Sequence, residues 1–68
     1  MSTMIAPVRL RGILRAGDRG FHLDSEDGQV WRIEGAEPYA SLAGQPVVIE
    51  AYRRASGALE LLWAGPAA

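Results

Sequence analysis

The groups that could carry out acid–base chemistry in this chain are few. His22 is the single histidine, and the sequence contains no cysteine. A general base needs a nucleophile or an orienting carboxylate within hydrogen-bond reach. Asp24 follows two residues after His22, on the same face of an expected strand, but the pattern indicates no apolar pocket around the pair. We therefore expect a non-enzymatic protein with no catalytic residue and no cofactor.

The acidic segment that begins at Asp24 reads Asp-Ser-Glu-Asp-Gly. A calcium-binding loop of the common type places glycine at its sixth position and glutamate at its twelfth. Counted from Asp24, these positions hold Gln29 and Gly35, so the spacing fails. Residues 17–20 contain two glycines but lack the lysine and the following helix of a phosphate-binding loop. Both segments are typical of turns, and we expect no metal site.

The basic residues are the strongest candidates for ligand binding. All seven are arginine, which a GC-rich genome explains most simply, although a planar guanidinium also suits phosphate. Several face outward on the first expected strand, and others end the fourth, where a tyrosine could stack on a base. The candidate nucleic-acid contacts are Arg9, Arg11, Arg15, Arg19, Tyr52, Arg53 and Arg54.

Three apolar residues are expected on the outside of the molecule. They are Ile13, Val48 and Leu62, which interrupt the polar side of three different strands. Grouped on one face, they would form a contact patch for a protein partner or for a second copy of the chain. Scattered, they would be ordinary surface residues. The sequence leaves both interpretations open.

The length of 68 residues allows one domain, residues 1–68, with an ordered core over about 5–64. An apolar fraction of 49% favours a folded chain, and a net charge of −1 gives no long-range field that attracts nucleic acid. No apolar run reaches the roughly 18 residues of a membrane span, and the N-terminus does not resemble a signal peptide. We expect a cytoplasmic protein without membrane contact.

Alternation of apolar and polar residues predicts short strands, because side chains on a strand point alternately to its two faces. Asp27-Gly28 is a strong hairpin signal. Residues 38–44 do not alternate and predict a helix or a 3₁₀ turn, whereas Gly65 begins an expected loose tail. The strands are expected at residues 8–15, 21–24, 30–34, 47–53 and 59–63.

This order predicts an all-β fold, a small five-stranded antiparallel OB-like barrel with a short helical turn between strands 3 and 4. An SH3-like barrel adaptor is the alternative. Closing the sheet removes its edges and surrounds the core. Gly12, on the inner face, would allow the first strand to bend. Residues expected to face inward are Val8, Leu10, Leu14, Phe21, Leu23, Trp31, Ile33, Leu42, Val47, Ile49, Leu59, Leu61 and Trp63.

The arrangement of these residues resembles a family of short bacterial OB-like domains of unknown function. The resemblance is carried by Leu10-x-Gly12-x-Leu14, Phe21-x-Leu23, Asp27-Gly28-x-x-Trp31-x-Ile33 and Leu42-x-Gly44-x-x-Val47-x-Ile49, and it extends over residues 8–63. Where that family often has a glycine late in the fourth strand, this chain has Ala51 or Tyr52. The matched positions are core residues and turn glycines, so the resemblance implies the fold and no ligand.

Two hypotheses of function follow. In the first, the chain is an interaction module that binds a protein partner or itself through the face that carries Ile13, Val48, Leu62 and the flanking arginines. In the second, it binds single-stranded nucleic acid weakly through the arginine stripe. The second is disfavoured because Asp18, Glu50 and Glu60 would neutralise the arginines. It is also disfavoured because the usual ligand face of OB barrels, strands 2 and 3, has no pair of exposed aromatic residues here.

Overall fold

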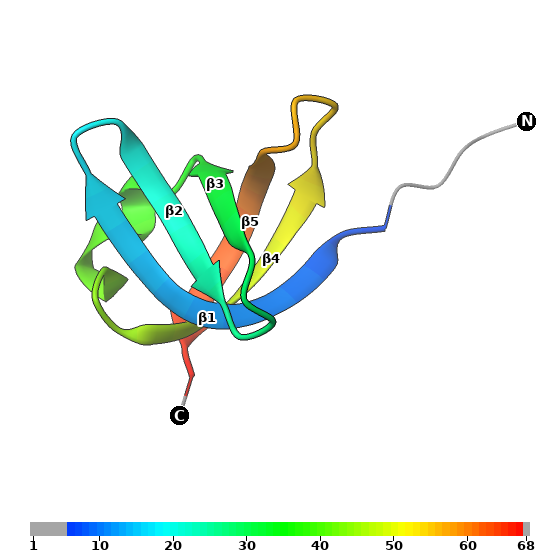
Figure 1. The fold of residues 1–68 in the computed structure, drawn as a ribbon. Coiled ribbons are helices and arrows are strands. Elements are labelled where there is room, and N and C mark those ends of the chain that lie inside the picture. Colours follow the sequence, from blue (N-terminus) through cyan, green and yellow to red (C-terminus); the bar gives the residue numbers. More distant parts are fainter. Residues whose placement is uncertain (1–5, 68) are drawn as a thin grey trace, which may run out of the picture.

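The computed structural model describes residues 6–67, and in this range it consists of five strands and one short 3₁₀ helix (Figure 1). The expected all-β fold with a helical turn between the third and fourth strands is confirmed. The expected domain covers residues 1–68, of which residues 1–5 and 68 lie outside the described part of the chain. The elements are β1 (Val8–Gly17), β2 (Gly20–Ser25), β3 (Val30–Glu34), η1 (Glu37–Leu42), β4 (Pro46–Arg53) and β5 (Leu59–Pro66).

The five strands close into a barrel in the order β1-β2-β3-β5-β4. Four pairings are antiparallel, but β3 and β5 are parallel, through Ile33 with Leu59 and Glu34 with Glu60. The expectation of a wholly antiparallel barrel is therefore wrong, and the reason is parity. Strand direction alternates around an antiparallel ring, so a ring of five strands must contain one parallel seam.

Strand β1 bends so that it can pair with both β2 and β4, and Figure 1 shows its strong curvature. The two ladders overlap at Gly12 and Ile13, and Gly12 pairs with Ser25 of β2 and with Val47 of β4. A Cβ atom at Gly12 would lie 2.1 Å from the carbonyl oxygen of Asp24. Only glycine permits this close approach, which confirms the expected role of Gly12 in bending the strand.

The barrel interior holds an aliphatic core. Leu14, Leu23, Val47, Ile49 and Leu59 are completely buried, as their alternation predicts. Ile33 and Leu61 are also buried, and the remaining residues expected inside are half-buried, with the exception of Trp63. Alanines complete the core at positions 36, 51, 58 and 64. Residues packed at its margin are Val8, Leu10, Phe21, Trp31, Tyr39 and Leu42.

Trp63 was expected inside the barrel, but 45% of it is exposed. The cause is an irregularity in the ladder between β4 and β5. Ala51 pairs with Leu61 and Glu50 pairs with Trp63, so Leu62 is an extra residue in β5. Such a β-bulge shifts the alternation by one position. It leaves Trp63 on the outer side of β5 and places the small Ala64 in the core.

The segment from Gly65 is not the loose tail expected from the sequence. β5 continues to Pro66, and the backbone N–H of Ala67 donates to the carbonyl oxygen of Pro46 at 3.0 Å. The hairpin predicted at Asp27-Gly28 is confirmed, with Gly28 at φ +90° and its N–H donating to the Ser25 carbonyl. The backbone N–H of Gln29 donates to the Asp27 carboxylate at 3.0 Å.

Candidate interaction surfaces

The outward sides of β1, β4 and β5 form one continuous surface, because β4 pairs with both neighbours. Val48 of β4 lies between Arg11 of β1 and Gly65 of β5. Ile13 is the next outward residue of β1 and lies diagonally from Val48. The three apolar candidates of the sequence therefore occupy adjacent strands. The structure adds Trp63, and the outer apolar surface is defined here as Ile13, Val48, Leu62 and Trp63.

Trp63 is the functional candidate that sequence reasoning missed. Leu62 is 44% exposed and Trp63 is 45% exposed, next to each other at the bulge. A Cβ atom built on Gly65 would lie 2.5 Å from Cη2 of Trp63, so the indole ring covers Gly65. The register then puts the ring beside Val48. The signal in the sequence was Leu61-Leu62-Trp63, three apolar residues without alternation, followed at Gly65 by a position with no side chain.

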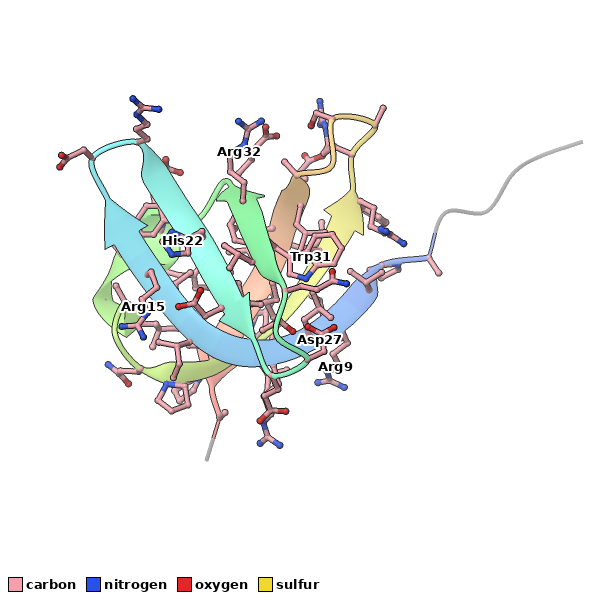
Figure 2. The ribbon with its side chains drawn as sticks, viewed as in Figure 1. Arg9, Arg15, His22, Asp27, Trp31 and Arg32 are labelled. Carbon is pink, nitrogen blue, oxygen red and sulfur yellow. The ribbon has the colours of Figure 1, made fainter. Side chains whose placement is uncertain are left out.

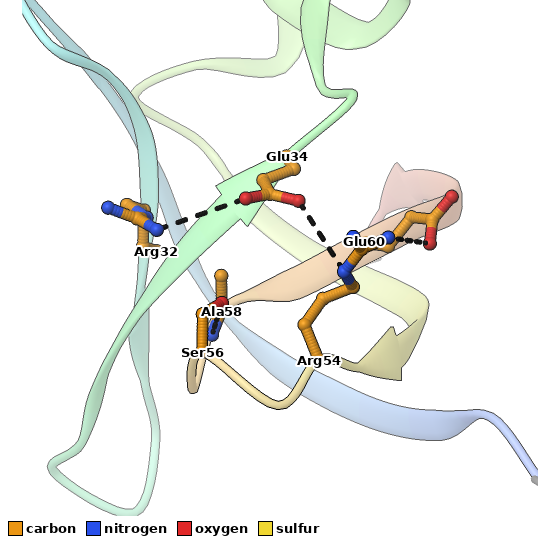
Figure 3. A network of polar contacts seen from close by, with 6 residues as sticks. All are labelled: Arg32, Glu34, Arg54, Ser56, Ala58 and Glu60. Carbon is orange, nitrogen blue, oxygen red and sulfur yellow. Dashed lines mark hydrogen bonds and ion pairs between the residues drawn. The ribbon is translucent and has the colours of Figure 1, made fainter.

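Three of the six arginines in the candidate stripe are paired with carboxylates. Arg9 lies 3.8 Å from Glu50, and Arg15 donates from Nε to Asp24 at 3.0 Å. Arg54 donates from Nη1 to Glu60 at 2.9 Å, and its Nε lies 4.0 Å from Glu34 (Figure 3). Two of the three neutralising carboxylates expected from the sequence, Glu50 and Glu60, have this role. Asp18 forms no ion pair within the described residues.

The remaining stripe residues do not gather in one place. Arg19 lies in the turn between β1 and β2, whereas Arg53 and Arg54 lie at the turn between β4 and β5. Figure 1 shows these turns at separate corners of the barrel. Tyr52 is half-buried and pairs with Glu60. Across residues 6–67, Arg11, Arg19 and Arg53 have no carboxylate within ion-pair distance.

The outer face of β2 and β3 carries mixed charges. His22 pairs with Arg32 and Asp24 pairs with Val30 across the two strands. The imidazole Nε2 of His22 lies 3.9 Å from the Asp24 carboxylate. A hollow of about 490 Å³ lies between this face and the β1–β2 turn. It is lined by Arg19, His22, Val30 and Arg32, among others.

A second hollow, of about 280 Å³, lies near the β2–β3 turn. Its lining includes Trp31 and Arg53, and Cζ of Arg53 lies 5.4 Å from the centroid of the Trp31 ring. Figure 2 shows Trp31 between β3 and β4, and Asp27 near it at the β2–β3 turn. The N–H of Gln29, and then the Ser25 side chain, lower the pKa of Asp27 by hydrogen bonding to its charged form.

Between residues 6 and 67, no helix has the length and apolar character needed to cross a membrane. In that same part of the chain, no three His, Asp or Glu side chains gather as a metal-binding group.

Together these features define a small all-β barrel. Comparison with protein families matches residues 11–67 to a family described as "Protein of unknown function (DUF5818)". The match covers most of the chain, which therefore belongs to this family. It confirms the resemblance to a short domain family of unknown function. Neither the curated proteins nor the solved structures contain a match to the chain.

Proposed function

We propose that this protein is a non-enzymatic, OB-like interaction module that binds a protein partner or a second copy of itself through the outer apolar surface. The short helix between β3 and β4 and the ring order of the strands support the OB-like assignment over an SH3-like adaptor. The bacterial origin and the cytoplasmic location stay predictions from the sequence.

The observation that carries the proposal is the exposure of Trp63 beside Leu62. Tryptophan is enriched among the residues that dominate binding energy in interfaces. The bulge in β5 turns this ring outward and places the small Ala64 in the core. A regular β5 would have buried Trp63, so the local structure favours presentation of the ring over its burial.

The surroundings of the surface also fit an interface. Interfaces combine an apolar centre with a polar rim. The pair of Arg9 with Glu50 borders Trp63, because Glu50 pairs with Trp63 across the ladder. Arg11 flanks Val48 on the other side. These charged groups would lie at the edge of the contact, where they remain in water and contribute mainly to specificity.

Sedimentation velocity over a wide range of protein concentration tests self-association. We expect the mass to increase with concentration for the native chain and to stay monomeric for Leu62→Asp/Trp63→Asp. Val30→Asp is the matched control, because Val30 is 67% exposed but lies on the β2–β3 face. It should associate like the native chain.

A native chain that stays monomeric leaves the partner form of the proposal, which cross-linking tests. A photoactivatable residue at position 62 should join one defined protein in cells, and the same residue at position 30 should not. The proposal fails if the native chain is monomeric and the two positions give the same cross-links.

Single-stranded nucleic acid is the second candidate ligand, favoured by one observation: Arg19 and Arg32 line the same hollow on the β2–β3 face. Fluorescence anisotropy of a labelled oligonucleotide at about 50 mM and about 200 mM salt would show binding that collapses at the higher salt. Arg19→Glu/Arg32→Glu should abolish it, whereas Arg9→Glu, on the opposite surface, should weaken it little. Absence of binding at low salt would exclude this candidate.

A further inference from the structure

The smaller hollow brings together groups from three stretches of the chain: residues 8–10, residues 27–31 and Arg53. Val8 and Leu10 come from β1, Asp27 and Gln29 from the β2–β3 turn, Trp31 from β3, and Arg53 from the end of β4. In Figure 2, Trp31 lies in the space between β3 and β4, above the turn that carries Asp27. The hollow thus lies where the barrel wall is not closed by strand pairing, since β3 meets β5 only at Ile33 and Glu34.

Trp31 has a hydrogen-bond donor without an acceptor. Its indole Nε1 is buried, and no acceptor lies within hydrogen-bond distance among residues 6–67. A buried donor that has no acceptor destabilises the folded chain. Among the buried side-chain nitrogen and oxygen atoms of residues 6–67, Nε1 of Trp31 is the one that lacks a hydrogen-bond partner. An acceptor oxygen from outside the chain would remove this destabilisation.

Arg53 adds a positive charge at the same place. Its guanidinium lies over the Trp31 ring, which holds it in position by a cation–π interaction. No carboxylate within the described range forms an ion pair with it, whereas its neighbour Arg54 contacts both Glu34 and Glu60. The N–H donors of Arg53 therefore keep their capacity for an anionic oxygen. The indole N–H and the guanidinium together favour a carboxylate, which offers two acceptor oxygens.

Asp27 limits which carboxylates fit. Its own carboxylate stays ionised, because the Gln29 N–H and the Ser25 side chain bond to its charged form. It would repel a carboxylate ligand that offers no N–H group nearby, but it would accept a hydrogen bond from an N–H group of the ligand. Val8 and Leu10 add a small apolar surface. A volume of about 280 Å³ is at the lower end for small-molecule sites.

We propose that this hollow binds the α-carboxylate end of an amino-acid residue with an aliphatic side chain. The carboxylate would accept hydrogen bonds from the Trp31 indole N–H and from Arg53. The α-nitrogen would donate to Asp27, and the side chain would rest on Val8 and Leu10. A free amino acid and the C-terminal residue of a peptide share this chemistry.

The Trp31 indole N–H can be observed directly as a proton–nitrogen NMR signal. Leucine, N-acetyl-leucine and leucinamide are the probes, titrated to about 10 mM, where even weak specific binding is visible. We expect a saturable downfield shift of the Trp31 signal with a carboxylate-bearing probe and no shift with leucinamide. Trp63, on the outer surface, supplies the internal control signal, which should not move. A Trp63→Phe variant assigns the two signals.

The probes also separate the two sources of the ligand. A response to leucine and N-acetyl-leucine alike indicates the C-terminus of a peptide. A response to leucine alone indicates a free amino acid, because acetylation removes the ammonium group that faces Asp27. Either response supports the site.

Matched variants test the assignment of groups. Arg53→Gln should weaken binding about tenfold or more, since it removes a charged hydrogen bond. Arg54→Gln, one residue further and held by Glu34 and Glu60, should bind like the native chain. Asp27→Asn should weaken the binding of leucine more than the binding of N-acetyl-leucine. The proposal is overturned if no probe shifts the Trp31 signal, if leucinamide shifts it equally, or if Arg53→Gln and Arg54→Gln behave alike.

Discussion

The two outward faces of the barrel differ in which side chains they expose. On the β1–β4–β5 face, the exposed Leu62 and Trp63 of β5 lie beside the half-buried Val48 of β4, and Arg9 is paired with Glu50 at the border. On the β2–β3 face, charged residues of both signs are mixed, and Val30 is exposed among them. Both faces belong to one closed sheet. Closure of the sheet therefore does not determine whether a face is apolar or charged. The local path of each strand determines it.

The β5 bulge accounts for much of this difference. The ladder between β2 and β3 is regular, so its outward residues are the polar half of each alternation. The ladder between β4 and β5 contains an extra residue at Leu62, and this puts two consecutive large apolar residues outside. One inserted residue therefore adds a tryptophan to the outer side of β5.

The largest expected effect comes from breaking the strand that both faces share. Gly12→Ala places a Cβ atom against the backbone carbonyl of Asp24, and backbone cannot swing aside as a side chain can. We expect a loss of about 3 kcal/mol or more of unfolding free energy, measured by denaturant titration with circular dichroism. Gly17→Ala, at the end of the same strand with its nearest atom at 3.9 Å, is the control. Equal stability of the two variants would contradict the role given to Gly12.

A smaller effect is expected from a change under the Trp63 ring. Gly65→Ala puts a Cβ atom 2.5 Å from Cη2 of Trp63, at the far end of a side chain that can rotate away. Stability should fall by about 1 kcal/mol or less. Trp63 should become more exposed, visible as a red shift of its fluorescence in a Trp31→Phe background. An unshifted spectrum would mean that the ring does not cover Gly65.

A mutation at the parallel seam between β3 and β5 should have a smaller effect on stability still. Arg54 links Glu34 of β3 with Glu60 of β5, but all three side chains are about half exposed (Figure 3). Exposed ion pairs contribute about 0–1 kcal/mol, and salt screens them. Arg54→Ala should lower the thermal midpoint slightly at low salt, and this difference should shrink at high salt. A large loss that persists at high salt would show that Arg54 stabilises the seam by packing.

The smallest effect concerns pH and the β2–β3 turn. Hydrogen bonds from the Gln29 N–H and the Ser25 side chain lower the pKa of Asp27 from its ordinary value of 3.8. The folded form therefore gains stability at pH values above 3.8, and this gain is lost as the pH falls through the lowered pKa. Thermal midpoints from neutral pH to below 3 should decline less for Asp27→Asn than for the native chain. Parallel curves would show that the turn makes no such contribution.

Much of the fold was predictable from the sequence because alternation and turn glycines are local signals. The strand positions, the bend at Gly12 and the hairpin at Asp27-Gly28 needed only neighbouring residues. Trp63 was predicted wrongly because Leu61-Leu62-Trp63 is compatible with two phases of alternation. Pairing with Glu50 and Ala51 of a distant strand selects between these phases.

The candidate surfaces were predictable in part. Ile13, Val48 and Leu62 were found because they break the polar side of a strand. The pairing of Arg15 with Asp24 depends on the register of two strands, which single residues do not reveal. The hollow beside Trp31 depends on three segments meeting where strand pairing ends, and no local pattern contains that information.

The short parallel seam has a consequence for the order of folding events. The pairings β1–β2, β2–β3 and β4–β5 each join neighbouring strands through short turns, whereas β1–β4 and β3–β5 join segments far apart in the chain. Distant contacts form late because the entropy of loop closure must be overcome first. The β4–β5 hairpin would thus dock onto the β1–β2–β3 meander and form both distant ladders in a single rate-limiting step. Until that step, the edges of β1 and β3 are open, and in this interval a nascent chain is most exposed to aggregation.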